Sequence, residues 1–142
     1  MTLSPREVVL GVLHGVCDRR LDDLPKYYAE HTDVRHPFDP QRAPALRTRD
    51  ELREHFARGL AAKPEMRREP RNIRIHETTD PEVVIGEFEY HSTVVETGET
   101  FDMPAIFVMR VRDGEIVESR DYADHLTVAK AMGRLGDLVA AR

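Results

Sequence analysis

The chain has 142 residues, 40% hydrophobic and 33% charged, with a formal net charge of −5, which is typical of one globular domain over residues 1–142. Arginine is mixed with acidic residues and forms no basic stripe, which argues against a nucleic-acid partner, and the single Cys17 excludes an internal disulfide. No apolar run reaches membrane-spanning length and the N-terminus lacks the pattern of a signal peptide, so we expect a cytoplasmic protein with no membrane partner.

The first sixty residues predict mainly helices. A helix begins at the capping box 4–7 (Ser-Pro-Arg-Glu), followed by apolar residues at helical spacing. A second helix is predicted over residues 22–30, with Tyr27 and Tyr28 on its apolar face. A short strand over 34–38 and a loop over 39–47 follow. A third helix begins at the capping box 48–51, carries His55 on its apolar face, and ends at Lys63-Pro64.

The rest of the chain predicts antiparallel strands over residues 73–76, 83–95, 101–111 and 116–124. Asp113-Gly114 is a strong signal for a two-residue hairpin turn, in which both residues need positive φ. The strand entering this turn has one apolar face, formed by Phe101, Met103, Ala105, Phe107 and Met109. In the strand leaving it, alternation places Val117, Ser119, Asp121 and Ala123 on one face and Ile116, Glu118, Arg120 and Tyr122 on the other. The residues after Asp124 predict a short helix, although Gly133 and Gly136 have low helix propensity.

Helices that precede a run of strands predict an α+β fold. A strongly curved antiparallel sheet, with the N-terminal helices over its concave face, would close into a cone. The inner strand faces of such a cone must be apolar, as the alternation of residues 101–109 indicates.

This pattern resembles the nuclear transport factor 2-like superfamily, which includes SnoaL-like polyketide cyclases, ketosteroid isomerases and limonene-epoxide hydrolases. The resemblance is carried by residues 27–37 (YYAEHTDVRHP), 48–59 and 112–124 (RDGEIVESRDYAD). It implies a cone-shaped α+β barrel with a deep pocket for a small hydrophobic molecule, in a superfamily whose members often form homodimers, and we expect a homodimer through the outer face of the sheet. It does not imply one reaction, because the superfamily contains several chemistries and non-catalytic binders.

The resemblance places Asp121 where the epoxide hydrolases keep a catalytic aspartate, in a similar Arg-Asp-Tyr-x-Asp run. Their other two charged residues fall on Phe88 and Tyr90, so that triad is broken here. A weaker likeness of residues 71–82 to the phenazine-biosynthesis branch would place Asp121 at that branch's catalytic glutamate.

His36-Pro37 falls where the steroid isomerases have their general base, an aspartate followed by proline. Their oxyanion-hole tyrosine falls near Val12 and their protonated aspartate near Ile106 or Phe107. Both hydrogen-bond donors are therefore missing, although a base is kept in the form of histidine.

Asp121 and His36 are the candidate proton-transfer groups. An aspartate titrates near ~3.9, so a useful acid at neutral pH needs an upward shift of roughly two to three units, which apolar walls can cause. The alternative is an aspartate at a strand end, paired with Arg120, Arg112 or His125. Imidazole needs little shift to act as a base. The alternative for His36 is a histidine satisfied by a backbone carbonyl.

Tyr90 is a candidate hydrogen-bond donor to a substrate oxygen, with core packing as the alternative. The residues expected to line the pocket are Phe88, Met103, Ala105, Phe107, Tyr28, His55 and Val34. A metal site built from His31, His36, His55 and Asp121 lacks close ligand spacing, so no metal is expected.

The leading functional interpretation is a cofactor-independent enzyme that isomerises or cyclises a small hydrophobic carbonyl or polyketide-like compound. Asp121 and His36 would move the proton and Tyr90 would orient an oxygen. Two alternatives remain open: a non-catalytic binding or accessory module of the same fold, and a dimeric scaffold whose cone is filled by its own side chains.

Overall fold

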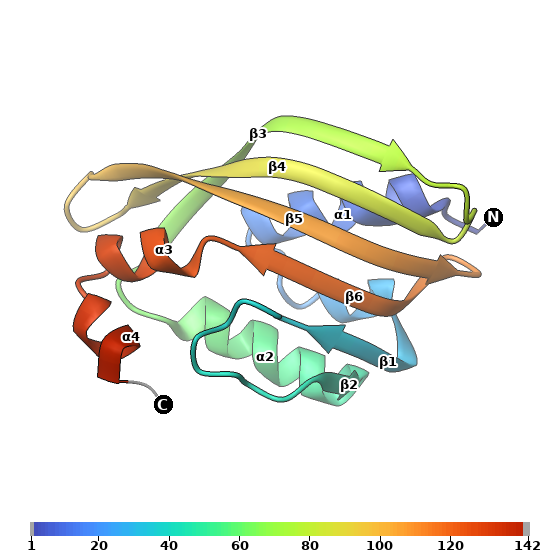
Figure 1. Ribbon diagram of the computed structural model, residues 1–142, viewed down its shortest axis with the longest axis horizontal. Helices are drawn as coiled ribbons and strands as arrows, with labels where there is room; N and C mark the ends of the chain where they lie inside the picture. The colour runs from blue at the N-terminus through green and yellow to red at the C-terminus, as the bar shows by residue number, and fades with distance from the viewer. Residues whose placement is uncertain (1, 141–142) are drawn as a thin grey trace.

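A curved sheet with helices packed on one of its faces organises the chain (Figure 1). The computed structural model describes residues 2–140, so residues 1 and 141–142 of the expected domain lie outside the described residues. The strands are β1 (Tyr28–Arg35), β2 (Leu46–Thr48), β3 (Met66–Glu77), β4 (Val83–Val94), β5 (Thr100–Arg112) and β6 (Glu115–Ala123). The helices are α1 (Pro5–Cys17), the 3₁₀ turn η1 (Leu24–Tyr27), α2 (Arg49–Ala61), α3 (His125–Ala131) and α4 (Leu135–Ala140).

The strand order in the sheet is β2-β1-β6-β5-β4-β3. Every neighbouring pair is antiparallel except β1 and β6, which run parallel. The predicted α+β class is confirmed, and the sheet is mixed at this one pair because the first long strand of the chain lies beside the last. Helix α1 packs on β3, β4 and β5, while α2 packs on β1 and β2.

Both predicted capping boxes begin helices. The Ser4 hydroxyl accepts a hydrogen bond from the Glu7 amide at 3.2 Å, and the Glu7 carboxylate accepts one from the Ser4 amide at 3.0 Å. At α2, the Thr48 hydroxyl accepts a hydrogen bond from the Glu51 amide at 3.1 Å. These bonds satisfy amide groups that the first turn of a helix leaves unpaired.

The predicted helix over residues 22–30 is wrong. Only the 3₁₀ turn at Leu24–Tyr27 forms, and Tyr28 already begins β1. Tertiary pairing overrides the local apolar pattern here, because β1 gains hydrogen bonds with both β2 and β6. The Thr32 hydroxyl adds a bond by donating to the Ile116 carbonyl at 3.0 Å.

The β5–β6 hairpin turns at Asp113 and Gly114, whose φ angles are +53° and +78°, as the sequence predicts. The predicted apolar face of β5 is also confirmed, with Met103, Ala105, Phe107 and Met109 buried and Phe101 half-buried. The predicted outward position of Ile116 is wrong, since this side chain is fully buried. Val111 pairs with Ile116 and Arg110 with Glu118, so Val117 is the extra residue of a β-bulge. The bulge turns both Ile116 and Ser119 toward the core.

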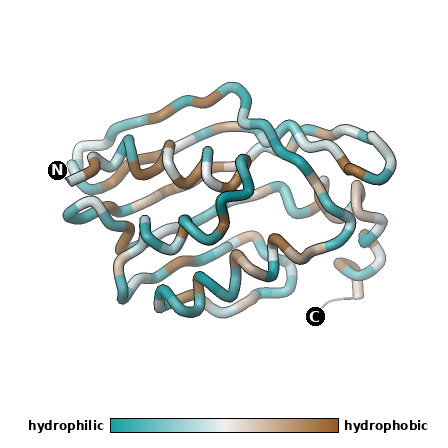
Figure 2. The backbone as a smooth tube through the Cα atoms, turned by 180° about the vertical axis from the view of Figure 1, so that it is seen from behind, coloured by the Kyte–Doolittle hydropathy of each residue, from teal (hydrophilic) through white to brown (hydrophobic). Residues whose placement is uncertain are grey.

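The core lies between α1 and the inner faces of the strands. Hydrophobic residues recur along α1 and the strands beside it, while hydrophilic residues dominate the outer side of α2 (Figure 2). The fully buried side chains include Leu13, Leu24, Leu52, Met109 and Ile116. The helix predicted after Asp124 is interrupted between α3 and α4, where Gly133 has a φ of +69°.

None of the helices within residues 2–140 is both long enough and apolar enough to span a membrane.

Candidate active site

A cavity of about 550 Å³ lies between the helices and the inner face of the sheet. Of the residues predicted to form the site, those that line this cavity are Asp121, His36, Tyr90, Met103, Phe107, Tyr28, His55 and Val34. Phe88 and Ala105 do not line it, which corrects that part of the prediction. Both are buried in the sheet, where the Phe88 ring lies 4.7 Å from the Phe107 ring and 4.9 Å from the Tyr90 ring. The empty volume contradicts the alternative of a cone filled by its own side chains.

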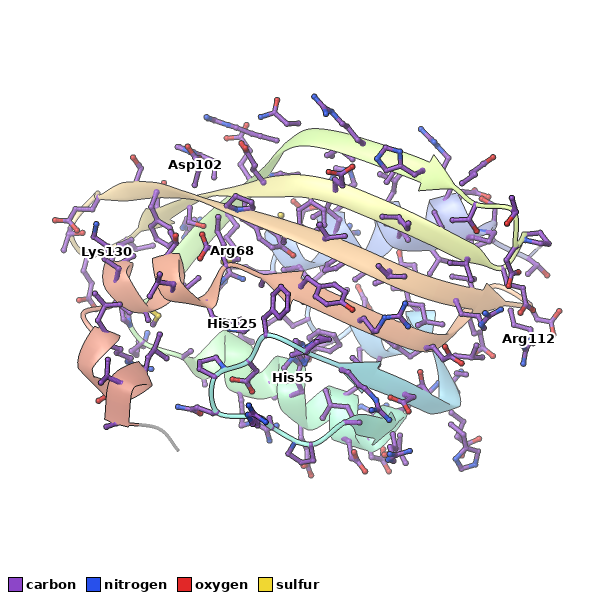
Figure 3. The ribbon with its side chains drawn as sticks, viewed as in Figure 1. His55, Arg68, Asp102, Arg112, His125 and Lys130 are labelled. Carbon is purple, nitrogen blue, oxygen red and sulfur yellow. The ribbon has the colours of Figure 1, made fainter. Side chains whose placement is uncertain are left out.

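Asp121 lies on β6 opposite Phe107 and faces the cavity. Its Oδ1 atom is buried and has no hydrogen-bond partner. Within the described residues, Asp121 forms no ion pair with Arg120, Arg112 or His125, the partners considered from the sequence. Arg112 instead binds Glu82 at 2.8 Å, at the end of the molecule away from α3 (Figure 3). Burial is the main cause that raises the pKa of Asp121 to about 7, and the positive charge of Arg68 opposes this rise. The carboxyl can therefore exchange a proton near neutral pH.

His36 follows the end of β1, and its Nε2 lies 3.8 Å from Oδ2 of Asp121. This distance is too long for a hydrogen bond but short enough for a small displacement, or one water molecule, to connect the two groups. Burial lowers the pKa of His36, and nearby His125 lowers it further, while Asp39 acts in the opposite direction. His36 is therefore largely neutral at pH 7.

The His55 ring stands against the His36 ring, with centroids 5.3 Å apart. Burial lowers the pKa of His55 to about 4, with smaller contributions from His36 and Arg58. Two neutral imidazoles thus lie next to a carboxyl that titrates near neutrality.

Tyr28 and Tyr90 are both buried and near Asp121. Burial raises the pKa of each phenol, and the negative charge of Asp121 raises both further. Both hydroxyls are therefore protonated at neutral pH and can donate a hydrogen bond to an oxygen in the cavity.

Sequence reasoning missed Arg68, which lies on β3 and lines the cavity. Its guanidinium carbon lies 5.2 Å from the centroid of the Tyr90 ring, and its Nε is buried without a hydrogen-bond partner. The predicted strand began at residue 73, whereas β3 begins at Met66. A β-bulge between Arg71 and Arg74 shifts the alternation of β3 by one residue, so extending the pattern of Ile73 and Ile75 back along the chain would have placed Arg67 inward in place of Arg68.

No group of three or more histidine, cysteine, aspartate or glutamate side chains within the described part of the chain is arranged to hold a metal ion. His31, one of the residues considered for such a site, is exposed on β1 and does not line the cavity.

A family model described as the SnoaL-like domain matches residues 9–119. Two curated relatives are similar in sequence. The uncharacterised protein YesE of Bacillus subtilis is 39% identical over 59 residues, which span 42% of this chain and 40% of the relative. An uncharacterised PhzA/B-like protein of Pseudomonas aeruginosa is 32% identical over 95 residues, which span 66% of this chain and 67% of the relative.

Solved structures share the fold at lower identity. A proposed isomerase from Bacillus subtilis aligns over 93% of this chain and 97% of its own, with a TM-score of 0.78 and 21% identity. A phenazine biosynthesis-related protein from Pseudomonas aeruginosa aligns over 92% and 81%, with a TM-score of 0.72 and 21% identity. A proposed polyketide cyclase from Xanthomonas campestris aligns over 87% and 93%, with a TM-score of 0.71 and 17% identity.

Proposed function

Because the chain belongs to the SnoaL-like domain family, we propose that it is an enzyme that isomerises or cyclises a small hydrophobic carbonyl compound by acid–base chemistry, without a cofactor. The observation that carries this proposal is the half-buried carboxyl of Asp121, which has a buried Oδ1 without a hydrogen-bond partner and a pKa of about 7, and which faces a cavity of about 550 Å³. Buried acids tuned toward neutral pH are concentrated at functional sites. The isomerase and polyketide cyclase named among the structural relatives agree with this class of reaction.

In the proposed first step, the ionised carboxylate of Asp121 removes a proton from the carbon next to the substrate carbonyl. The electrons of the broken C–H bond move to the carbonyl oxygen and form an enolate. Tyr90, whose pKa is raised and whose hydroxyl is therefore protonated, donates a hydrogen bond to that oxygen as negative charge develops. Neutral His36, 3.8 Å from Asp121, receives the proton or returns it through a water molecule.

The fate of the enolate distinguishes the two outcomes. In an isomerisation, protonated Asp121 returns the proton to a different carbon and the double bond moves. In a cyclisation, the enolate carbon attacks a second carbonyl of the same molecule, a C–C bond forms, and the proton goes to the new alkoxide. Met103, Phe107 and Val34 provide apolar walls that would fold such a chain and exclude water.

The proposal is tested by exchange of α-protons for deuterium in a hydrophobic ketone, so that the natural substrate need not be known. 2-Tetralone in D₂O, followed by proton magnetic resonance, reports the first step alone. Asp121→Asn and His36→Ala are each expected to slow the catalysed exchange at least ~100-fold, the usual scale of general acid–base catalysis. Circular dichroism checks that both variants keep the fold. Exchange by both variants at the wild-type rate would refute the mechanism.

The second candidate function is a non-catalytic binding module. It is favoured by the 3.8 Å separation of His36 and Asp121, which leaves the two groups without a direct hydrogen bond. The same exchange experiment separates the two functions, because a binding module would not accelerate exchange above the buffer rate.

A further inference from the structure

Arg68 is a cation without a counter-ion inside the cavity. Within residues 2–140 no carboxylate lies close enough to form an ion pair with it, and its buried Nε has no hydrogen-bond acceptor. The face of the Tyr90 ring, 5.2 Å from the guanidinium carbon, is the contact that holds it in place. An aromatic face compensates only part of the hydration that a guanidinium loses on burial.

More arginines than acids line the cavity, although the whole chain carries a net charge of −5. Four arginines are among the described lining residues (Arg19, Arg58, Arg68 and Arg134), whereas Asp121 is the single acid among them. Arg19 and Arg134 donate to backbone carbonyls of Leu60, Met66 and Lys63, and Arg19 also lies 3.9 Å from Glu65. Arg58 is exposed to solvent, whereas Arg68 has a buried Nε without a hydrogen-bond partner within the described residues.

Asp121 does not neutralise this charge. The charge of Arg68 lowers the pKa of the Asp121 carboxyl, but no ion pair joins the two groups within residues 2–140, and a carboxyl with a pKa of about 7 is protonated in a large fraction of molecules at neutral pH. The neighbouring imidazoles are largely neutral. An anionic group on the ligand would therefore meet the half-buried guanidinium of Arg68 and a free N–H donor, its buried Nε.

We infer that the ligand of this cavity is a hydrophobic carboxylate, whose anionic end is held by Arg68 while its apolar body lies along Met103 and Phe107. The Nε edge of a guanidinium presents two parallel N–H groups, which match the two oxygens of a carboxylate. The identification of this ligand as the substrate rests on the proposed function, because its reactive carbonyl would then lie at Asp121. The carboxylate site itself does not depend on turnover.

Isothermal titration calorimetry tests the inference with two probes of the same shape, 2-naphthoate and the neutral 2-naphthamide. The wild-type protein is expected to bind the carboxylate at least about tenfold more tightly, the scale of one charge-assisted hydrogen bond. Arg68→Met keeps an apolar stem and removes the charge, and it should abolish this preference while leaving amide binding within about threefold. Arg68→Lys keeps the positive charge but lacks the two parallel N–H groups of the guanidinium, and it should retain part of the preference for the carboxylate.

Arg67→Met is the matched control, because Arg67 is the preceding residue on β3 and is exposed on the opposite face. It removes the same charge from the protein and should leave the preference unchanged. A wild-type protein that shows no preference for the carboxylate, including one that does not bind it, overturns the inference without any substitution. Equal loss of preference in Arg67→Met and Arg68→Met also overturns it, since the effect would then come from the overall field.

The two proposals can fail separately. Asp121→Asn should still prefer 2-naphthoate while losing exchange of 2-tetralone protons. If Asp121→Asn keeps the preference for 2-naphthoate and also exchanges 2-tetralone protons at the wild-type rate, the proposed mechanism is refuted and the carboxylate site stands. If exchange depends on Asp121 but the protein shows no preference for the carboxylate, the carboxylate site is refuted and the mechanism stands.

Discussion

Replacing Asp121 by asparagine should make the protein more stable at pH 8 than the wild type. The folded protein resists ionisation of this carboxyl, because burial raises its pKa from an ordinary value of 3.8 to about 7. Between these two values the folded state binds more protons than the unfolded state. The stability contributed by neutral Asp121 is therefore complete below pH 3.8 and is lost progressively as the pH rises through about 7.

The magnitude follows from the size of the shift. A rise from 3.8 to about 7 corresponds to about 4 kcal/mol of folding free energy at high pH. Water that enters the cavity and relaxation around the charge reduce this figure, so we expect Asp121→Asn to gain 2–4 kcal/mol, roughly, relative to the wild type between pH 4 and pH 8. The corresponding increase in the relative midpoint of thermal unfolding is roughly 5–15 °C.

The assay is urea denaturation of both proteins at several pH values from 4 to 8, followed by circular dichroism. The difference between variant and wild type cancels the titration of every other group. Asp22→Asn, at an exposed site, is the control for loss of one negative charge, and it should change the stability by less than about 0.5 kcal/mol at every pH. A difference between Asp121→Asn and the wild type that stays constant from pH 4 to 8 would refute the assignment of a buried, proton-holding carboxyl.

Three further predictions concern catalysis, the core and assembly. Exchange of 2-tetralone protons should rise with pH through about 7 and then level off, because the ionised carboxylate of Asp121 is the base; a rate that is flat from pH 5 to 9 argues against it. Ile116→Ala should lower the free energy of unfolding, measured by urea denaturation, by about 2–5 kcal/mol because the Ile116 side chain is fully buried, whereas Val117→Ala at the bulge should lower it by less than about 1.5 kcal/mol. Equal losses in the two variants would contradict the bulge. We propose a homodimer through the outer face of the sheet, where Phe38 and Ile106 are exposed beside a shallow apolar groove; Ile106→Glu should then shift the molecular mass measured by light scattering toward the monomer, and an unchanged mass would count against this interface.

The strands were predictable from sequence because their alternation is read within a few residues. The face of β5 that carries Met103 and Phe107 is an example, since each buried residue is followed by one that is less buried. The hairpin at Asp113-Gly114 was predictable for the same reason, because positive φ is a property of the turn residues themselves.

The features that were missed depend on distant parts of the chain. Tyr28 begins a strand because β2 and β6 are beside it, which the apolar spacing of residues 21–28 does not reveal. Asp121 was placed correctly on a face by alternation, but the size of the cavity beside it depends on helices more than fifty residues away. Arg68 was missed because the predicted strand began at residue 73, and because the bulge between Arg71 and Arg74, which depends on pairing with β4, decides which residues of β3 face inward.

The bulge at Val117 decides which charge the cavity receives. An unbroken ladder from the same turn would set Arg120, in place of Asp121, opposite Phe107, because every later residue would move by one position. Deleting Val117 would preserve the acid, since the ladder would simply become regular. Inserting one residue between Ser119 and Arg120 would instead set Arg120 opposite Phe107 and turn an arginine inward, so a single codon gained at this point of the strand would exchange a proton donor for a permanent cation.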